Sequence, residues 1–159
     1  MDNSKSVRKW SEIHNLAVVD THEGKTLGHV ADFYLQKGSN AIYALSVRTR
    51  LYGDLTLPAT GIKSIEDGRI TVINAQMLLK AIPPYVHGHS LLKQKVEGQN
   101  ERELGTIEDI LLGVDPLSAL RVTGYEVANG TSRHRVFTAD TVAQYRDDAI
   151  VIYDQAVKK

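Results

Sequence analysis

The sequence predicts a mainly β protein in which one small barrel-like unit occurs twice in tandem. Residues 57–72 (LPATGIKSIEDGRITV) align with residues 137–152 (FTADTVAQYRDDAIVI) without a gap, and this pair is the later block of the repeat. Residues 27–32 (LGHVAD) align with residues 104–109 (LGTIED), and this pair is the earlier block. The offset, which is the number of residues between equivalent positions, is three smaller in this block than in the later one. Two matching blocks in the same order indicate an internal repeat. The change of offset predicts a turn three residues longer in the second copy, near residues 115–118.

Short apolar runs separated by turn-forming residues are typical of strands and fit no helical period. Asp67-Gly68 and Asn129-Gly130 favour tight turns, and the second pair suits a two-residue hairpin loop. Strands are therefore expected at residues 16–21, 28–36, 41–49, 54–59 and 69–74 in the first copy, and at 93–98, 105–114, 119–128, 133–138 and 149–154 in the second.

Four other segments favour helical turns. Residues 60–65 and 140–145 each place apolar side chains three positions apart, which fits one helical turn at the end of a barrel. A further turn is expected at residues 11–14, and a short linker helix at residues 75–82.

The Pro83-Pro84 pair marks the domain boundary, because neither residue can continue a helix or join a central strand. We place the first domain at residues 1–80 and the second at residues 85–159, each with about five strands and a short helical turn. Units this small leave much of their surface exposed, so we expect them to pack together as a pseudo-twofold pair.

Composition excludes several classes of function. Lys and Arg number 19, as do Asp and Glu, so the chain has no net charge to drive binding to a nucleic-acid backbone. With no cysteine, it offers no disulfide, zinc ribbon or thiol nucleophile. The first residues lack the apolar stretch of a signal peptide, and no apolar run is long enough for a transmembrane helix. We expect a soluble, cytoplasmic protein.

The first copy can be compared with a known family. Val18-Val19-Asp20, followed by residues 24–33 (GKTLGHVADF), resembles the opening of a PRC-barrel domain, and residues 57–72 resemble its closing segment. This family is named after the cytoplasmic barrel of the photosynthetic reaction-centre H subunit, and the same domain forms the C-terminal part of a ribosome maturation factor. The second copy keeps Leu104-Gly105 but has Glu101 in place of the turn glycine, Gly24, which makes its turn less secure.

The resemblance implies two small PRC-like β-barrels in tandem that act mainly as an adaptor, with no shared catalytic residue. Two departures stand out. The reaction-centre subunit has a membrane-spanning helix before its barrel, and the maturation factor carries a different barrel there. Neither role transfers directly, and function has to be argued from sites.

Asp32 and Asp109 occupy equivalent positions, next to the equivalent glycines Gly28 and Gly105. A buried carboxylate can serve as a general base, or it can accept backbone N–H groups and hold a turn or strand end. A catalytic residue rarely needs to occur twice in one structural position, so we interpret all four residues as structural.

His87-Gly88-His89 has the spacing of a bidentate metal clamp, since alternate residues of an extended chain share a side. Glu97 or Glu101 would supply a third ligand. The motif follows Pro83-Pro84 in the expected linker, however, where rigid placement of ligands is difficult. We therefore favour an exposed linker and expect neither a metal nor another cofactor, although the sequence leaves the metal question open.

Basic residues gather at equivalent hairpins of the two copies: Arg48, Arg50 and Tyr52 in the first, and Arg133, His134 and Arg135 in the second. Such residues solvate a loop, contact a protein surface or bind phosphate. We expect any partner to bind here. Trp10, the single tryptophan, is expected to cap the first barrel with its indole N–H near the surface.

No phosphate loop, nucleophile elbow or His-Glu-x-x-His motif occurs in the chain. The sequence therefore favours a non-enzymatic interaction or assembly module that binds another protein or a second copy of itself. Two alternatives stay open. One is an accessory role at RNA–protein assemblies, and the other is the binding of a small ligand between the two barrels.

Overall fold

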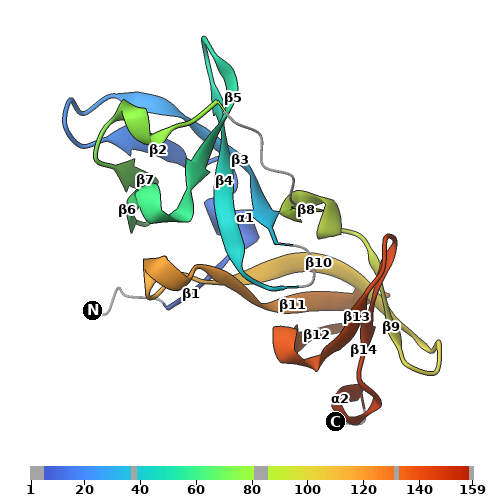
Figure 1. Ribbon diagram of the computed structural model, residues 1–159. Helices are drawn as coiled ribbons and strands as arrows, with labels where there is room; N and C mark the ends of the chain where they lie inside the picture. Colours follow the sequence, from blue (N-terminus) through green and yellow to red (C-terminus); the bar gives the residue numbers. More distant parts are fainter. Residues whose placement is uncertain (1–5, 37–38, 81–85, 131–132, 158–159) are drawn as a thin grey trace.

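The computed structural model describes residues 6–36, 39–80, 86–130 and 133–157 of the chain. It is mainly β and consists of two curled sheets, each of seven strands (Figure 1). In Figure 1, the blue-to-green half of the chain forms most of the first sheet and the yellow-to-red half forms most of the second. The predicted fold class, a tandem of two barrel-like units, is confirmed.

The two sheets have the same strand order, β5-β4-β3-β2-β7-β6 in the first and β12-β11-β10-β9-β14-β13 in the second. In each, one parallel pair joins the beginning of the unit to its end, β2 with β7 and β9 with β14, and all other neighbours pair antiparallel. The first sheet contains β2 (Ala17–Asp20), β3 (Thr26–Leu35), β4 (Ile42–Thr49), β5 (Gly53–Pro58), β6 (Ile62–Ile65) and β7 (Arg69–Val72). The second contains β9 (Lys95–Gly98), β10 (Glu103–Gly113), β11 (Arg121–Asn129), β12 (Arg133–Thr138), β13 (Val142–Tyr145) and β14 (Ala149–Ile152).

Each unit passes its leading short strand to the sheet of the other unit. The strand β1 (Val7–Lys9) pairs with β10, and β8 (Val86–His87) pairs with β3. A helical segment follows each exchanged strand: α1 (Trp10–Ile13) after β1, and the 3₁₀ turn η3 (Gly88–Leu91) after β8. Along the chain each exchanged strand precedes its own unit, while in space it belongs to the sheet of the other.

Reciprocal backbone contacts give the pair its twofold character. The N–H of Ile42 donates to the carbonyl of Leu120 at 3.0 Å, and the N–H of Val122 donates to the carbonyl of Asn40 at 2.8 Å. The offset of the later repeat block relates Ile42 to Val122 and Asn40 to Leu120. Because the same contact is made twice with the roles exchanged, a pseudo-twofold axis passes between the two sheets, as the repeat predicts.

The buried side chains follow the repeat. Alternate residues of the long strands point inward, so that Val30, Phe33 and Leu45 in the first unit match Ile107, Ile110 and Tyr125 in the second, all fully or almost fully buried. One connected apolar cluster contains residues of both units.

The short segments differ from the prediction. The expected helical turns at 60–65 and 140–145 are strands β6 and β13, each preceded by a three-residue 3₁₀ turn, η1 (Ala59–Gly61) and η5 (Ala139–Thr141). Apolar spacing of three fits a helical turn as well as a bulged strand, and both strands carry a register shift. Among the described residues, each unit therefore contributes six strands to its own sheet, one more than the five expected.

The remaining short elements also need correction. The expected linker helix at 75–82 is only the 3₁₀ turn η2 (Ala75–Met77), after which Leu79 makes a single β-bridge to Thr56, while residues 81–82 lie outside the described residues. The long turn of the second unit contains η4 (Leu117–Ala119), and the C-terminal helix α2 is Asp154–Val157. Within the described part of the chain, no helix is long and apolar enough to cross a membrane.

Glu101 adopts a left-handed backbone conformation, with φ of 67°, at the position where the first unit has Gly24 with φ of 72°. This conformation is strained for a residue with a Cβ atom. Replacing Glu101 with glycine is therefore expected to raise the free energy of unfolding by about 0.5–1 kcal/mol, measured by chemical denaturation. Gly24→Ala, the matched change in the first unit, is expected to lower it. A neutral or destabilising effect of Glu101→Gly would contradict the argument from strain.

Candidate functional site

The equivalent carboxylates Asp32 and Asp109 lie where the two units meet. Each follows a bulge in its strand, since the register with the neighbouring strand shifts between Val30 and Asp32 and again between Ile107 and Asp109. A bulge redirects the side chain that follows it. In both strands it places the carboxylate beside the helical segment that belongs to the other unit.

Each carboxylate accepts a hydrogen bond from a backbone N–H of that segment. Oδ1 of Asp32 accepts the N–H of His89 at 2.8 Å, and Oδ1 of Asp109 accepts the N–H of Ser11 at 3.1 Å. The second oxygens are also bound, by the ring Nδ1 of His87 at 3.1 Å and by the hydroxyl of Ser11 at 2.5 Å. Both carboxylates therefore cap a helical segment of the opposite unit.

Gly28 and Gly105 lie where neighbouring backbones approach closely. A Cβ atom on Gly28 would lie 2.4 Å from the carbonyl oxygen of Arg48, and one on Gly105 would lie 2.3 Å from that of Ala128. Gly105 also has φ of 140°. Only glycine fits at these two points of the strands without a shift of the backbone.

Trp10 lies between the two units and not at the end of one barrel. Its side chain is buried, its ring packs at 4.8 Å from the ring of Phe33, and its Nε1–H donates to Nδ1 of His89 at 2.9 Å. The indole N–H was expected near the surface. The Trp10 side chain is buried, but the histidine that accepts its N–H is exposed. His14 packs beside this pair, 4.8 Å from the His89 ring, and burial, together with the electrostatic effect of His89, lowers the pKa of His14.

His87 and His89 do not lie in an exposed linker. They belong to β8 and η3, which are held against β3 of the first sheet. Each ring has its own partner, Asp32 for His87 and Trp10 for His89. Among the described residues, no group of three or more histidines and acidic residues has the arrangement of a metal site.

The first basic hairpin lies at the end of the β4–β5 ribbon, which extends away from the second sheet in Figure 1. Arg48 binds Asp54 through two guanidinium nitrogens, Nε at 3.0 Å and Nη2 at 3.3 Å. Arg50 and Tyr52 are exposed at the tip together with Leu51, which is 80% exposed. An aromatic, an aliphatic and a basic side chain are therefore available for contact at one place.

The second basic group belongs to strand β12 and to the other sheet, so the structure does not join it to the first. His134 is exposed, while the side chain of Arg133 lies outside the described part of the chain. Arg135 is not a loop residue. Its guanidinium lies 4.7 Å from the centre of the Phe137 ring and donates to the carbonyls of Ala156 and Val157, which holds helix α2 beside β12.

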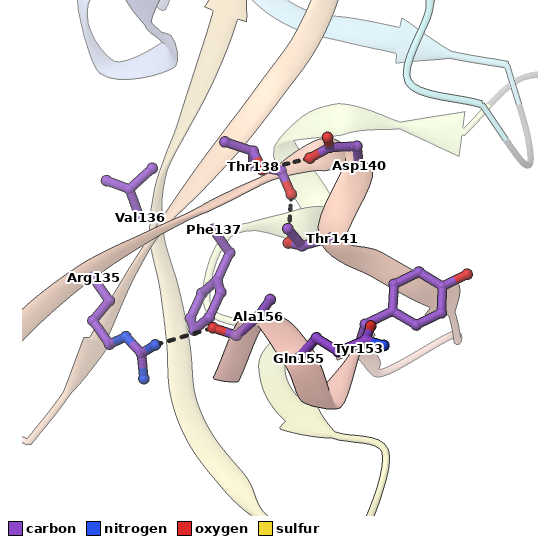
Figure 2. Close-up of a pocket in the computed structure, with 9 residues that line it drawn as sticks. All are labelled: Arg135, Val136, Phe137, Thr138, Asp140, Thr141, Tyr153, Gln155 and Ala156. Atoms are coloured by element: carbon purple, nitrogen blue, oxygen red, sulfur yellow. Dashed lines mark hydrogen bonds between the residues drawn. The ribbon is translucent and has the colours of Figure 1, made fainter. Parts of the chain in front are cut away.

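A hollow of about 610 Å³ lies between β12 and α2 (Figure 2). Arg135, Val136 and Phe137 line it from the strand, and Tyr153 and Ala156 line it from the C-terminal segment. Val136 and Tyr153 are 54% and 43% exposed, a large fraction for apolar side chains. The sequence analysis missed this site, because the alternation of exposed and buried residues along β12 does not show which strand lies at the edge of a sheet.

The corresponding edge of the first sheet is covered. Thr56 in β5 exchanges two backbone hydrogen bonds with Leu79, both at 2.7 Å. Val136 is the equivalent of Thr56, because the two positions are related by the offset of the later repeat block. Their strand partners, Glu126 and Ser46, are related by the same offset. The N–H and C=O of Val136 therefore point away from β11. Among the described residues, no segment pairs with them.

The architecture defines this chain as a small β-barrel protein with two repeated units joined by exchanged strands. Residues 6–76 match the family model described as PRC-barrel domain. Residues 6–76 therefore form a PRC-barrel domain, as the sequence resemblance predicts. The match covers the first unit, and the second unit has the same strand order. A comparison with curated proteins found no match.

Proposed function

We propose that this PRC-barrel protein is a non-enzymatic interaction module that binds an extended segment of another protein along the outer edge of β12. We assign its two units to residues 1–80 and 85–159, as the repeat predicts. The observation that carries the proposal is the difference between two equivalent edges. Leu79 covers Thr56 in the first unit, whereas no described residue covers Val136 in the second.

An uncovered strand edge can accept another strand through its backbone groups. The covered edge of the first unit supports one kind of occupant: a short extended segment whose bridging residue, like Leu79, is apolar. The hollow beside Val136 and the exposed ring of Tyr153 provide apolar contact for the side chains of such a segment. These features support a partner segment with apolar residues next to the bridging position.

Of the two basic groups, only that of β12 lies beside this edge. His134 lies at the exposed start of β12, and Arg50 and Tyr52 lie at the tip of the β4–β5 hairpin. Basic side chains beside an edge favour acidic residues in the partner and exclude basic ones. Domains of this family often mediate protein interactions and are generally non-catalytic, which agrees with the proposal.

The test is capture of partners by the immobilised chain and by two variants of Val136. Proline at this position removes the outward N–H, while threonine reproduces the residue found in β5. Val136→Pro is expected to reduce the amount of the captured partner about tenfold or more, because it loses a backbone hydrogen bond and the proline ring obstructs the edge.

Val136→Thr is expected to retain the partner. Circular dichroism of both variants checks that the sheets are intact, since an edge strand tolerates proline where its N–H faces solvent. A partner captured equally by the wild type and Val136→Pro would contradict the proposed edge. If Tyr52→Ala and not Val136→Pro abolishes capture of the partner, the binding surface is the β4–β5 hairpin.

A further inference from the structure

Arg8 and Val86 occupy equivalent positions in the two exchanged strands. Arg8 of β1 lies opposite Leu112, and Val86 of β8 lies opposite Leu35. Leu35 and Leu112 are themselves equivalent, because the offset of the earlier repeat block relates β3 to β10. The pseudo-twofold axis therefore places a long cationic side chain on one side of the protein and a short apolar side chain on the other.

Arg8 is buried, with only 7% of its side chain exposed, and its guanidinium lies against the turn between β6 and β7. Nη2 donates to the carbonyl of Glu66 at 3.3 Å and lies 3.6 Å from the carboxylate of Asp67. Nε lies 3.7 Å from the carboxylate of Glu12. This side of the protein thus holds a guanidinium group that its own chain supplies.

On the other side, the equivalent space is a hollow of about 460 Å³. Val86 is too short to fill it. The hollow is lined by apolar side chains, among them Leu35, Leu91 and Val142, and by the turn between β13 and β14. In Figure 1, β8 and this turn lie on the same side of the molecule. The hollow is separate from the edge of β12 and shares no lining residue with the pocket there.

The groups that receive Arg8 are repeated around this hollow. Arg146 and Asp147 line it, and they are the equivalents of Glu66 and Asp67. The two turns have the same geometry, since residue 66 donates its N–H to the carbonyl of Arg69 and residue 146 to that of Ala149, each at 2.8 Å. A backbone carbonyl and a carboxylate are therefore present at the positions that a guanidinium occupies on the opposite side.

The charges around the hollow leave these acceptors available. The side chain of Arg146 is bound by Glu97 at 2.5 Å, and the Asp147 carboxylate has no ion-pair partner within the described ranges. Gln94, which also lines the hollow, has a buried Oε1 with no hydrogen-bond partner among the described residues. The equivalent residue of the first unit is the apolar Leu16, since its carbonyl accepts the N–H of Val30 as that of Gln94 accepts the N–H of Ile107. The site thus has one more acceptor than the described residues satisfy.

We propose that this hollow binds a guanidinium group on a flexible aliphatic stem, either as a free small molecule or as an arginine side chain of a partner. The planar guanidinium presents five donors in fixed directions, which suits acceptors of three kinds placed around one cavity. The apolar walls receive the stem, as aliphatic stems of long cationic side chains prefer.

The first experiment measures the binding of n-butylguanidine and n-butylamine to the full chain by calorimetry and by the NMR signal of the Gln94 amide. n-Butylguanidine is expected to bind. n-Butylamine is expected to bind at least about tenfold more weakly, because an ammonium group cannot donate several hydrogen bonds in one plane. A lack of binding by n-butylguanidine, or equal binding of the two compounds, would overturn the proposal.

Three variants test the assignment of the site. Asp147→Asn is expected to weaken n-butylguanidine binding about tenfold, since it removes the charged acceptor. The matched variant Asp67→Asn, whose carboxylate faces Arg8, is expected to bind the compound unchanged. Val86→Arg is expected to abolish binding, because it supplies the guanidinium that Arg8 supplies on the other side. Unchanged binding by Val86→Arg or Asp147→Asn would overturn the site.

A blocked tripeptide with a central arginine, acetyl-Gly-Arg-Gly-amide, distinguishes the sources. If the peptide binds as well as n-butylguanidine does, and Val86→Arg abolishes its binding, the site takes an arginine side chain of a partner. If only the small compound binds, the site takes a free guanidinium compound. Either result supports the proposed chemistry, and it does so independently of the β12 edge, which Val136→Pro tests.

Discussion

Replacing Trp10 with alanine is expected to lower the free energy of unfolding by about 3–5 kcal/mol, the typical loss for a fully buried tryptophan. Trp10 is only 1% exposed and packs on the ring of Phe33. It belongs to α1, which follows a strand of the second sheet, but it contacts the first sheet and η3. Its loss therefore removes core volume and loosens the contact between the units.

The measurement is chemical denaturation followed by far-ultraviolet circular dichroism, because Trp10 is the only tryptophan and its fluorescence disappears with the substitution. Trp10→Phe, which keeps an aromatic ring but loses the hydrogen bond to His89, is expected to lose less stability. Tyr52→Ala serves as the control for an exposed aromatic, 67% exposed, and is expected to change the stability by less than about 0.5 kcal/mol. A loss below about 1 kcal/mol for Trp10→Ala would show that the indole is not a core residue.

The second large effect is expected for Asp109→Ala, with a loss of about 3 kcal/mol in the free energy of unfolding. Its carboxylate is buried and accepts three hydrogen bonds, from the N–H and hydroxyl of Ser11 and from the N–H of Ile110. Bonds to a charged acceptor contribute more than neutral ones, and removal of the acceptor leaves these donors unpaired.

Asp32→Ala is the matched variant and is expected to lose less stability, because its carboxylate is 18% exposed and one of its partners, His87, is 56% exposed. The double-mutant cycle of Asp109→Ala with Ser11→Ala is expected to show a coupling of about 1 kcal/mol. Hydrogen exchange is expected to speed up first at the amides of β1 and α1. Equal losses for the two aspartates, or no coupling to Ser11, would contradict the role assigned to Asp109.

Much of the fold could be predicted from the sequence because the repeat and the strand pattern are local signals. Each of the ten predicted strands overlaps a strand of the structure, and the change of offset between the two repeat blocks falls in the turn between β10 and β11. Glu101 keeps the left-handed conformation of Gly24, so the turn forms there despite the Cβ atom. The weakest predictions concern segments of two to four residues, which are too short to show a period.

The functional candidates depended more on tertiary structure. The equivalence of Asp32 and Asp109 could be read from the repeat, but their partners, His89 and Ser11, lie far away in sequence. The sequence shows that Arg135 is basic, but it does not show that Arg135 binds α2. Neither hollow could be predicted, since each depends on what the opposite unit or the C-terminal segment leaves unfilled.

By itself, the sequence determined that one barrel-like unit occurs twice, where its long strands lie, and that equivalent glycines and aspartates recur in both copies. These properties follow from side-chain periodicity and turn chemistry, which act over a few neighbouring residues. Only the tertiary structure decided that β1 and β8 each join the sheet of the other unit, that no described segment covers the edge of β12, and that the space beside Val86 stays open where Arg8 fills its equivalent. The physical reason is that a strand of two or three residues gains its free energy from the sheet it joins, and its own residues do not specify which sheet that is.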